Sequence, residues 1–375
     1  MSSQPRSLLF TPLTLRGLTL RNRTVLSPMC QYSAHDGLAG DWHFVHLGQF
    51  ATGGFGLVFT EAAAVSAEGR ITHGDIGLWS DAQVAPLARI AHYAREHGAA
   101  LGIQLAHAGR KASMQRPWHG NGPLAAADFD RGDLPWPIVG PVQRPHHEGW
   151  LAPSALDTAG ITRIVGAFAA AARRADAAGI DVVEIHGAHG YLLHSFLSPV
   201  SNTRTDDYGG DLAGRMRFPL EVARAVRAAW PAHKPLFFRT STLDGIEGGG
   251  TLDDAVAFAR ELKHAGVDVV DCSAGGFLAS RFDVRPGYLV PNAARVRAEA
   301  AIATQAVGFI TRPEQAEEVL RSGAADLVAV GREALVDPHW AAQAALALEG
   351  DAGWAQWPAQ YAWWLERRAT TMRKF

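Results

Sequence analysis

Two histidines and a tyrosine follow an apolar run near the middle of the sequence. His186 and His189 come at and just beyond the end of the run Val182–Ile185, and Tyr191 lies two residues further on. Imidazole and phenol groups can ligate a metal, donate a hydrogen bond or transfer a proton. Zinc needs a third protein ligand, and too few cysteines are present to supply one. We therefore expect no metal, and packing at the end of a buried strand is the alternative to a role in catalysis.

Small and basic residues follow two later apolar runs. Gly308 comes shortly after the run Ala301–Ala306, whereas Gly331 and Arg332 come directly after Leu327–Val330. Glycines let backbone N–H groups approach a phosphate closely, and an arginine adds bidentate, charge-assisted hydrogen bonds. These residues predict a phosphate site.

The elements that must position these residues repeat one pattern, an amphipathic helix, a glycine and a short apolar strand. In one copy, a helical face beginning at Ile161 and capped by Asp157 or Thr158 leads through Gly179 into a strand. In two others, Thr251 with Asp254 and Thr311 with Glu314 form possible capping boxes. The strands predicted in this way span residues 24–28, 57–61, 101–105, 182–185, 236–239, 269–272, 301–306 and 327–330.

Most of these strands are continuously apolar, which is typical of a parallel sheet buried on both faces. No G-x-G-x-x-G motif follows the first strand, so a (β/α)8 TIM barrel is favoured over a dinucleotide-binding sheet. Active sites of such barrels lie at the C-terminal ends of the strands, and the loops after the last two strands often bind phosphate. Further polar or small residues at those ends are Ser27, Pro28, Met29, Cys30 and Tyr32, then Ala62, Gln104, Arg239 and Ser273.

Length and charge narrow the possible classes. The chain has 375 residues, 47% of them apolar, and a barrel with insertions accounts for this length, so we predict one domain over residues 1–375. Lys plus Arg total 35 against 37 for Asp plus Glu, which gives no net field for nucleic acid or an anionic membrane. No membrane-spanning run or signal peptide is evident. We therefore expect a cytoplasmic enzyme.

Three segments depart from the repeated pattern. Residues 115–150 are rich in Pro, Gly and Trp, and a loop of this length is usually a functional lid or a disordered segment, so we predict a lid-like insertion. Residues 8–20 resemble a short β-hairpin that caps the barrel floor. Residues 354–375 form a tail that contains Trp354, Trp357, Trp363 and Trp364.

Four segments together resemble the Old Yellow Enzyme family, in its thermophilic-like, xenobiotic-reductase branch. They are Ser27-Pro28-Met29-Cys30, the run from Gln104 to Arg110, the run from His186 to Tyr191, and the run from Thr203 to Gly210. The resemblance covers nearly the whole chain and keeps the spacing of these segments. It implies an ene-reductase in which NADPH or NADH reduces a non-covalent FMN, and the reduced enzyme then reduces an activated alkene.

The resemblance also implies a role for each site residue. FMN is assigned to Ser27, Pro28, Met29, Cys30, Ala62, Gln104, Arg239, Ser273, Gly308, Gly331 and Arg332. His186 and His189 would polarise the oxygen of an enone, enal or nitroalkene, Tyr191 would supply the proton, and Tyr32 would line the pocket. A buried Arg239 needs an anionic partner, which is either the reduced flavin or a carboxylate such as Asp244.

The tail departs from the family pattern. Part of the branch places an arginine in the pocket of a neighbouring subunit, but this sequence has Tyr361-Ala362-Trp363-Trp364-Leu365 there. We expect Trp363 or Trp364 to line a substrate pocket across the interface of a homodimer. Rival hypotheses are a metal-dependent barrel hydrolase and a non-catalytic flavin-binding protein. His107 and Lys111 are either ligand contacts or solvated polar groups.

Overall fold

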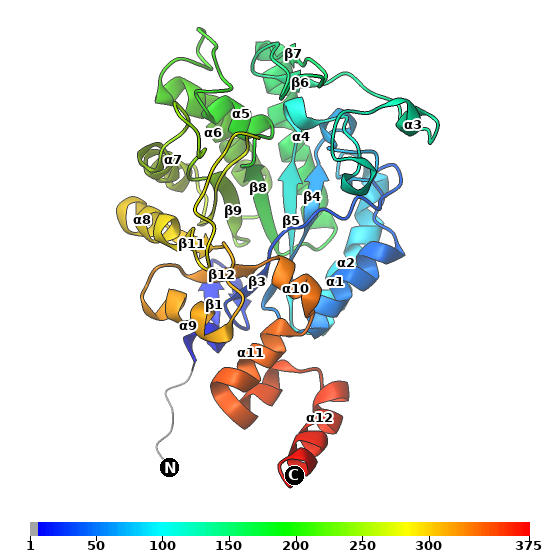
Figure 1. Cartoon of the computed structure of the whole chain (residues 1–375), viewed down its shortest axis with the longest axis vertical. Coiled ribbons are helices and arrows are strands. Elements are labelled where there is room, and N and C mark those ends of the chain that lie inside the picture. Colours follow the sequence, from blue (N-terminus) through cyan, green and yellow to red (C-terminus); the bar gives the residue numbers. More distant parts are fainter. Residues whose placement is uncertain (1–6) are drawn as a thin grey trace.

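The computed structural model describes residues 7–375 and contains a closed barrel of eight parallel strands (Figure 1). The strands are β3 (Thr24–Leu26), β4 (Leu57–Ala64), β5 (Ala100–Ala106), β8 (Val182–Gly187), β9 (Leu236–Ser241), β10 (Val269–Ser273), β11 (Ala303–Ala306) and β12 (Leu327–Val330). The circle closes where β12 pairs with β3. The predicted (β/α)8 barrel and all eight of its predicted strands are confirmed.

Helices surround the barrel and bury their apolar stripes against it. They are α1 (Asp41–Thr52), α2 (Val84–Glu96), α4 (Thr158–Ala177), α6 (Leu212–Ala229), α7 (Leu252–His264), α8 (Val290–Ala300), α9 (Pro313–Arg321) and α11 (Trp340–Glu349). Asp157 caps α4, and Thr251 forms the predicted capping box with Asp254 at α7. The predicted box of Thr311 and Glu314 is wrong, because α9 begins at Pro313, after Arg312, and has no side-chain cap. Proline at the first helical position supplies the start signal instead.

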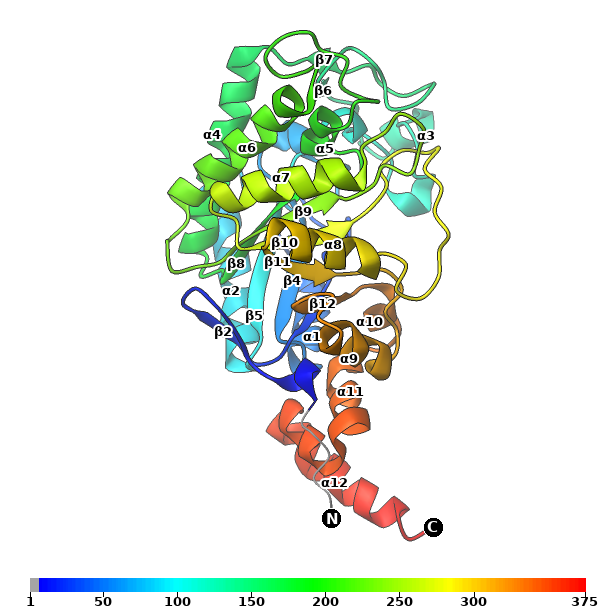
Figure 2. The same ribbon diagram turned by 90° about the vertical axis from the view of Figure 1, so that its left-hand side faces the viewer.

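A β-hairpin closes the floor of the barrel, at the N-terminal ends of the strands. Its strands β1 (Leu13–Leu15) and β2 (Leu18–Leu20) pair antiparallel below the sheet (Figure 2). Leu13, Leu15, Leu18 and Leu20 pack with apolar residues of the strands, among them Val182 and Phe237. The predicted hairpin cap is confirmed.

The other end of the barrel carries the long loops. The segment 115–150 lies there and contains the short elements η5 (Pro117–His119), α3 (Ala126–Phe129) and β6 (Val139–Gly140), the last paired with β7 (Ser154–Ala155) (Figure 1). Short elements η2 (Ala67–Gly69), η3 (Asp81–Gln83), η4 (Gly109–Lys111), α5 (Leu192–Leu197) and α10 (Arg332–Val336) also interrupt the loops between strands and helices. This placement agrees with a lid, which stays a prediction.

The C-terminal tail lies at the floor end. It consists of η6 (Gly350–Gln356), which packs on α11, and α12 (Ala359–Met372), which projects away from the barrel (Figures 1 and 2). Near the other terminus, η1 (Leu8–Phe10) contacts α9. The predicted single domain also includes residues 1–6, which lie outside the described residues. Among residues 7–375, no helix is both long and apolar enough to span a membrane.

Candidate active site

A polar layer crosses the interior of the barrel directly above its apolar floor. Alternate residues of a strand face the same way, so Glu184 lies one level above Val182 and His186 one level above Glu184. The strand register places Gln104 beside Glu184, Arg239 beside Asp271, and Asp271 beside Gln305. All five polar residues of this layer are buried.

Charge in this layer is only partly compensated within the chain. Gln104 Nε2 donates to Glu184 Oε1 at 2.8 Å, and Arg239 Nε lies 3.2 Å from Asp271 Oδ2. The alternative partner expected for Arg239, Asp244, is wrong, because Asp244 instead bonds to His194. Burial raises the pKa of Glu184 to about 8 and also raises the pKa of Asp271, although Arg239 opposes both shifts.

Several polar atoms of the layer and its surroundings have no hydrogen-bond partner within the described chain. They are Ser27 Oγ, Glu184 Oε2 and His186 Nδ1, and the buried Arg239–Asp271 ion pair has no other hydrogen-bond partner at Arg239 Nε or Asp271 Oδ2. Buried polar groups are normally paired with protein or water, and leaving one unpaired costs about 1–3 kcal/mol. Such a concentration of unpaired groups indicates that this end of the barrel receives a polar ligand.

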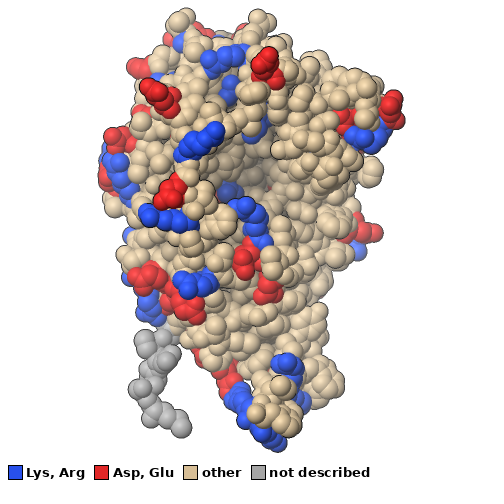
Figure 3. All heavy atoms as spheres, in the orientation of Figure 1, with Lys and Arg blue, Asp and Glu red and all other residues tan. Residues whose placement is uncertain are grey.

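The predicted phosphate residues line one cavity of about 270 Å³, together with two other predicted cofactor residues. Its walls include Arg239, Ser273, Gly308, Gly331 and Arg332. Gly308 has φ +121°, a conformation that other residues rarely adopt, whereas a Cβ added to Gly331 would make only ordinary van der Waals contacts. On the face drawn in Figure 3 the surface is hollowed, and Lys or Arg side chains stand at the rim of the hollow.

The end of β3 adjoins this cavity. Ser27 N donates to Val330 O at 3.0 Å, so the segment after β3 runs beside the end of β12. A Cβ added to Gly331 would lie 3.8 Å from Met29 Sδ and 3.8 Å from Ser27 Cβ. On β4, which pairs with β3, Ala62 is the register partner of Gln104 of β5. The predicted cofactor residues therefore come together at the C-terminal end of the barrel.

His186, His189 and Tyr191 gather at the mouth of the barrel, after β8. The His186 ring lies 5.2 Å from the His189 ring and 5.1 Å from the Tyr191 ring, measured between centroids. Burial, followed by the charge of Arg239, holds the pKa of both histidines well below the ordinary value, so both are neutral near pH 7. Burial raises the pKa of Tyr191 well above its usual value, which keeps the phenol protonated.

Cys30 and Tyr32 join Tyr191 in a small apolar cluster at the same mouth. Trp136 and Trp150, from the segment 115–150 predicted as a lid, pack there too, although no sequence pattern singled them out. Burial raises the pKa of the Cys30 thiol, and the nearby Glu61 adds to the effect. Cys30 is therefore a neutral thiol rather than a thiolate nucleophile.

Lys111 is a further cation of this site. Its Nζ donates to His189 O at 3.0 Å and lies 4.7 Å from the centroid of the Tyr191 ring. Burial, with Arg110 as the second cause, lowers the pKa of Lys111 to about 8. His107 is fully buried and its Nδ1 accepts from Gly109 N, so neither residue is a solvated polar group.

Asp75 was missed by the sequence analysis. It is buried and lines the same small cavity as His186 and Tyr191. Its carboxylate accepts hydrogen bonds from the backbone N–H groups of Ile71 and Thr72. Burial raises its pKa to about 7. No sequence signal could have found it, because it lies in an irregular loop between β4 and α2 rather than at the end of a strand.

Trp363 and Trp364 do not lie in the site of their own chain. Both are on α12, at the opposite end of the barrel from the two histidines, and they are 49% and 67% exposed (Figure 1). A substrate contact by either residue would have to be made in another subunit. Across residues 7–375 the histidines, cysteines and carboxylates form no group of three or more that could hold a metal ion.

The barrel carries an arginine-lined cavity and a buried polar layer at one end, as an enzyme that binds an anionic cofactor requires, and comparison with known proteins specifies the class and the family. Residues 8–350 match the NADH:flavin oxidoreductase / NADH oxidase family, and the chain belongs to it. It is 45% identical to the NADPH dehydrogenase of Geobacillus sp. (strain WCH70) over 336 residues, which cover 89% of this chain and 92% of that protein. It is also 43% identical to the NADPH dehydrogenase of Bacillus subtilis (strain 168) over 339 residues, 90% of this chain and 94% of that protein.

Solved structures agree with this assignment. Morphinone reductase superposes with a TM-score of 0.75 at 27% identity, covering 92% of this chain and 91% of that chain. An old yellow enzyme homologue from Zymomonas mobilis gives a TM-score of 0.71 at 25% identity, with coverage of 88% and 90%. The predicted membership of the Old Yellow Enzyme family is confirmed, and this chain is an NAD(P)H-dependent flavin oxidoreductase.

FMN is the cofactor of this family, and the residues present fit it. Arg332 offers a cation to a phosphate, and Gly308 and Gly331 line the same cavity, where a glycine backbone N–H can approach a phosphate closely. The flavin ring has a polar edge, which suits the unpaired groups of the layer around Arg239.

Proposed function

We propose that this enzyme reduces activated alkenes such as enones, enals and nitroalkenes by a ping-pong mechanism. One observation carries the proposal: two neutral histidines and a protonated tyrosine lie together, with ring centroids 5.1–5.2 Å apart, at the mouth above the cofactor site. When bound and reduced by NADPH or NADH, FMN supplies the hydride. Every other requirement of the reaction falls to side chains of the chain.

His186 and His189 stabilise the charge that develops on the substrate. Addition of hydride to the β-carbon pushes electron density onto the carbonyl or nitro oxygen. A neutral imidazole carries one N–H, so the two rings can each donate one hydrogen bond to that oxygen, His189 from Nδ1 while its Nε2 accepts from Ser273 Oγ. Preorganised donors of this kind contribute about 2.7–4 kcal/mol each to the transition state. Burial strengthens the effect, because it excludes competing water.

Tyr191 supplies the proton that the α-carbon needs. Its phenol stays protonated in this environment, so it can act as a general acid at neutral pH. Lys111 above the Tyr191 ring favours the phenolate left by that transfer, since a cation attracts the developing negative charge. Tyr32 packs in the same cluster and lines the pocket.

The cofactor residues divide the remaining tasks. Arg332, Gly308 and Gly331 would hold the phosphate, while Ser273 lies on the cavity wall and bonds to His189 Nε2 at 2.7 Å. Gln104 and Arg239 would face the polar edge of the ring, where the Arg239 cation favours negative charge. Ser27, Pro28, Met29, Cys30 and Ala62 would line the ring, and Cys30 would tune its potential as a polarizable neutral thiol.

We propose that the tail completes a homodimer of this cytoplasmic enzyme. None of the residues of α12 is buried, and Tyr361, Trp363, Trp364 and Met372 are all exposed on it. Large exposed apolar surfaces of this kind mark interaction sites. Insertion of Trp363 or Trp364 into the pocket of a second copy would both cover them and line that pocket.

Replacement of Tyr191 by phenylalanine tests the proposal. The variant should bind FMN and be bleached by NADPH as the wild type is, because the ring remains and no proton from the phenol is needed there. Re-oxidation by 2-cyclohexenone should slow by about 100-fold, the lower range for loss of a general acid. Stopped-flow absorbance measures both steps. An unchanged rate with the enone would show that Tyr191 is not the proton donor.

A further inference from the structure

His189 adopts a backbone conformation that has to be held in place. Its φ is +61°, in the left-handed region that non-glycine residues rarely occupy, and Gly190 follows with φ +76°. Such conformations persist only where surrounding contacts fix them. Gly190 also lies against the backbone of Gly276, so close that an added Cβ would be 2.2 Å from Gly276 O. The turn that presents His189 and Tyr191 is therefore tightly constrained.

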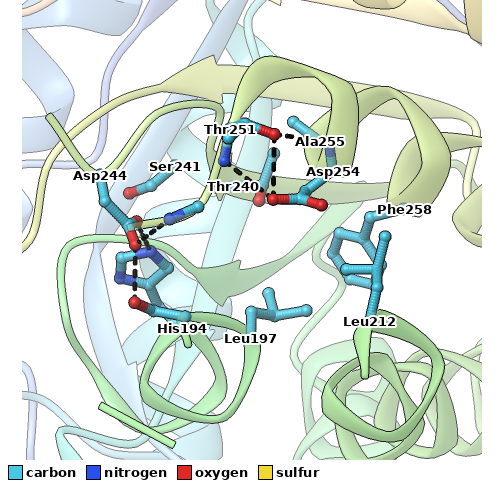
Figure 4. A pocket seen from close by; sticks show the side chains of 12 residues that line it. His194, Leu197, Leu212, Thr240, Ser241, Asp244, Thr251, Asp254, Ala255 and Phe258 are labelled. Carbon is cyan, nitrogen blue, oxygen red and sulfur yellow. Dashed lines mark hydrogen bonds and ion pairs between the residues drawn. The ribbon is translucent and has the colours of Figure 1, made fainter. Parts of the chain in front are cut away.

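A buried histidine–aspartate pair, whose side chains Figure 4 draws, binds the backbone of this turn. His194 Nδ1 accepts a hydrogen bond from Gly190 N at 2.8 Å. Because Nδ1 is the acceptor, the ring proton resides on Nε2, which donates to Asp244 Oδ1 at 2.8 Å. Both side chains are at most 3% exposed.

Asp244 is itself fixed from two further directions. Its Oδ2 accepts from Ser198 Oγ at 2.6 Å and from Gly250 N at 2.6 Å. Burial alone would raise the pKa of this carboxyl, but the hydrogen bonds from His194, Ser198 and Gly250 outweigh it and lower the pKa. The carboxylate is thus an ionised acceptor that orients the His194 ring.

A second buried pair has the same arrangement after β3. Tyr32 has φ +50°, again left-handed, and its N–H donates to Glu61 Oε2 at 3.3 Å. The same oxygen accepts from Gln31 N. Glu61 Oε1 bonds to His43 Nε2 at 2.9 Å, and His43 Nδ1 accepts from Gly40 N at 3.0 Å, which fixes its tautomer in the same way.

We propose that His194–Asp244 and His43–Glu61 are positioning pairs that hold the strained backbones presenting His189, Tyr191 and Tyr32 at the mouth of the barrel. In each pair one histidine nitrogen bonds to the backbone and the other to a buried carboxylate. The pairs differ in which member binds the strained turn. After β8 the histidine, His194, binds it, whereas after β3 the carboxylate, Glu61, binds it. The consequence for catalysis rests on the proposed function, but the positioning itself does not.

Two substitutions of His194 separate its two hydrogen bonds. In His194→Asn the amide oxygen takes the place of Nδ1 and can still accept from Gly190 N. In His194→Gln the longer side chain reaches Asp244 but leaves Gly190 N without its acceptor. A cavity of about 30 Å³ lies beside His194 and Asp244, so the glutamine has some room to adjust (Figure 4).

Amide hydrogen exchange of the oxidised, FMN-loaded enzyme measures the positioning directly. The Gly190 amide should exchange about tenfold faster in His194→Gln, the loss expected for one hydrogen bond, and should stay near the wild-type rate in His194→Asn. Equal exchange at Gly190 in both variants, whether slow or fast, would overturn the assignment. Glu61→Gln provides an independent test, because a glutamine has only one accepting oxygen, whereas Glu61 accepts from the backbone with one oxygen and from His43 with the other. If the glutamine keeps the bond from His43, exchange at the Tyr32 or Gln31 amide should rise by a similar factor. If the His43 ring changes tautomer to preserve those bonds, exchange at the Gly40 amide should rise instead.

Kinetics then connect the pairs with catalysis. Re-oxidation of the NADPH-reduced His194→Gln enzyme by 2-cyclohexenone should slow by about tenfold or more, because small misplacements of catalytic groups can lower rates up to about 100-fold. His194→Asn should recover most of the loss. Faster exchange at Gly190 with an unchanged enone rate would support the positioning pair and contradict the proposed role of His189 and Tyr191. Unchanged exchange would contradict the pair whatever the kinetics.

Discussion

The two ends of the barrel are built from opposite kinds of residues. At the floor, the leucines of the β1–β2 hairpin pack on the apolar first residues of the strands. At the mouth, the same strands end in histidine, arginine, serine and glycine, and the polar layer beneath leaves several buried atoms without partners. The floor therefore stabilises the barrel by burial of apolar surface, whereas the mouth gives up stability to keep polar groups ready for a ligand.

Positive φ angles sharpen this contrast. At the floor Arg16 has φ +51° in the tight turn of the hairpin, where this conformation is usual. At the mouth His189 and Tyr32 have similar angles, but each lies beside a buried histidine–carboxylate pair that bonds to its backbone or to the next residue. The difference shows that strain at the mouth is fixed by dedicated side chains rather than by turn geometry alone.

The largest effect on stability is expected at the floor. Leu20 is 1% exposed and packs beneath the strands, so Leu20→Ala should lower the free energy of unfolding by about 2–5 kcal/mol. FMN content and enone reduction per folded molecule should not change, because the site is at the other end. Chemical denaturation followed by flavin analysis measures both. Leu18→Ala, at a partly exposed position of the same strand, is the matched control and should lower the free energy of unfolding by less.

Loss of a predicted phosphate ligand at the mouth should weaken FMN binding and leave the stability of the chain unchanged, the reverse of the Leu20 result. Arg332→Ala should weaken FMN binding by roughly 1.5–3 kcal/mol, the usual contribution of a hydrogen bond to a charged group, while the apoprotein keeps its stability. Arg332→Lys should recover part of the affinity, since it restores the charge without the bidentate geometry. Flavin fluorescence titration reports the affinity. Normal FMN binding by the alanine variant would remove Arg332 from the phosphate site.

A smaller effect is expected from Cys30. Replacing its neutral thiol by the hydroxyl of Cys30→Ser changes the polarizability next to the flavin ring without removing a reacting group. The reduction potential should shift, and both half-reactions should change modestly. Potentiometric titration and stopped flow test this. A fully flavinated but inactive Cys30→Ser enzyme would indicate covalent thiol chemistry instead.

The tail should give the smallest effect on folding. Trp364 is 67% exposed, so Trp364→Ala should alter the stability of the chain by no more than about 0.5 kcal/mol. Its effect should appear in the preference among bulky enones, and deletion of residues 354–375 should weaken dimerisation. Sedimentation and substrate profiling measure these. A truncated protein with unchanged solution mass and kinetics would show that the tail has no part in assembly or in the pocket.

The fold could be predicted almost completely from the sequence, because continuous apolar strands ending in glycine or polar residues recur at regular intervals. Gly308, Gly331 and Arg332 could also be singled out from the sequence, since each lies within two residues of a strand end, and the three line one cavity. Residues that reach the site only through long-range packing could not be predicted from the sequence. Asp75, Trp136 and Trp150 reach the mouth from irregular loops, and Asp271 replaced Asp244 beside Arg239 only through the register of β9 and β10.

The central claim is that the histidine pair polarises the oxygen of the alkene, and stopped flow on His186→Ala and His189→Ala tests it most directly. Each variant removes one donor, so re-oxidation of the NADPH-reduced enzyme by 2-cyclohexenone should slow by about 100-fold or more. Reduction by NADPH should suffer much less, because hydride transfer to FMN places no charge on an oxygen held by these rings. Small and equal losses in both half-reactions would contradict the account.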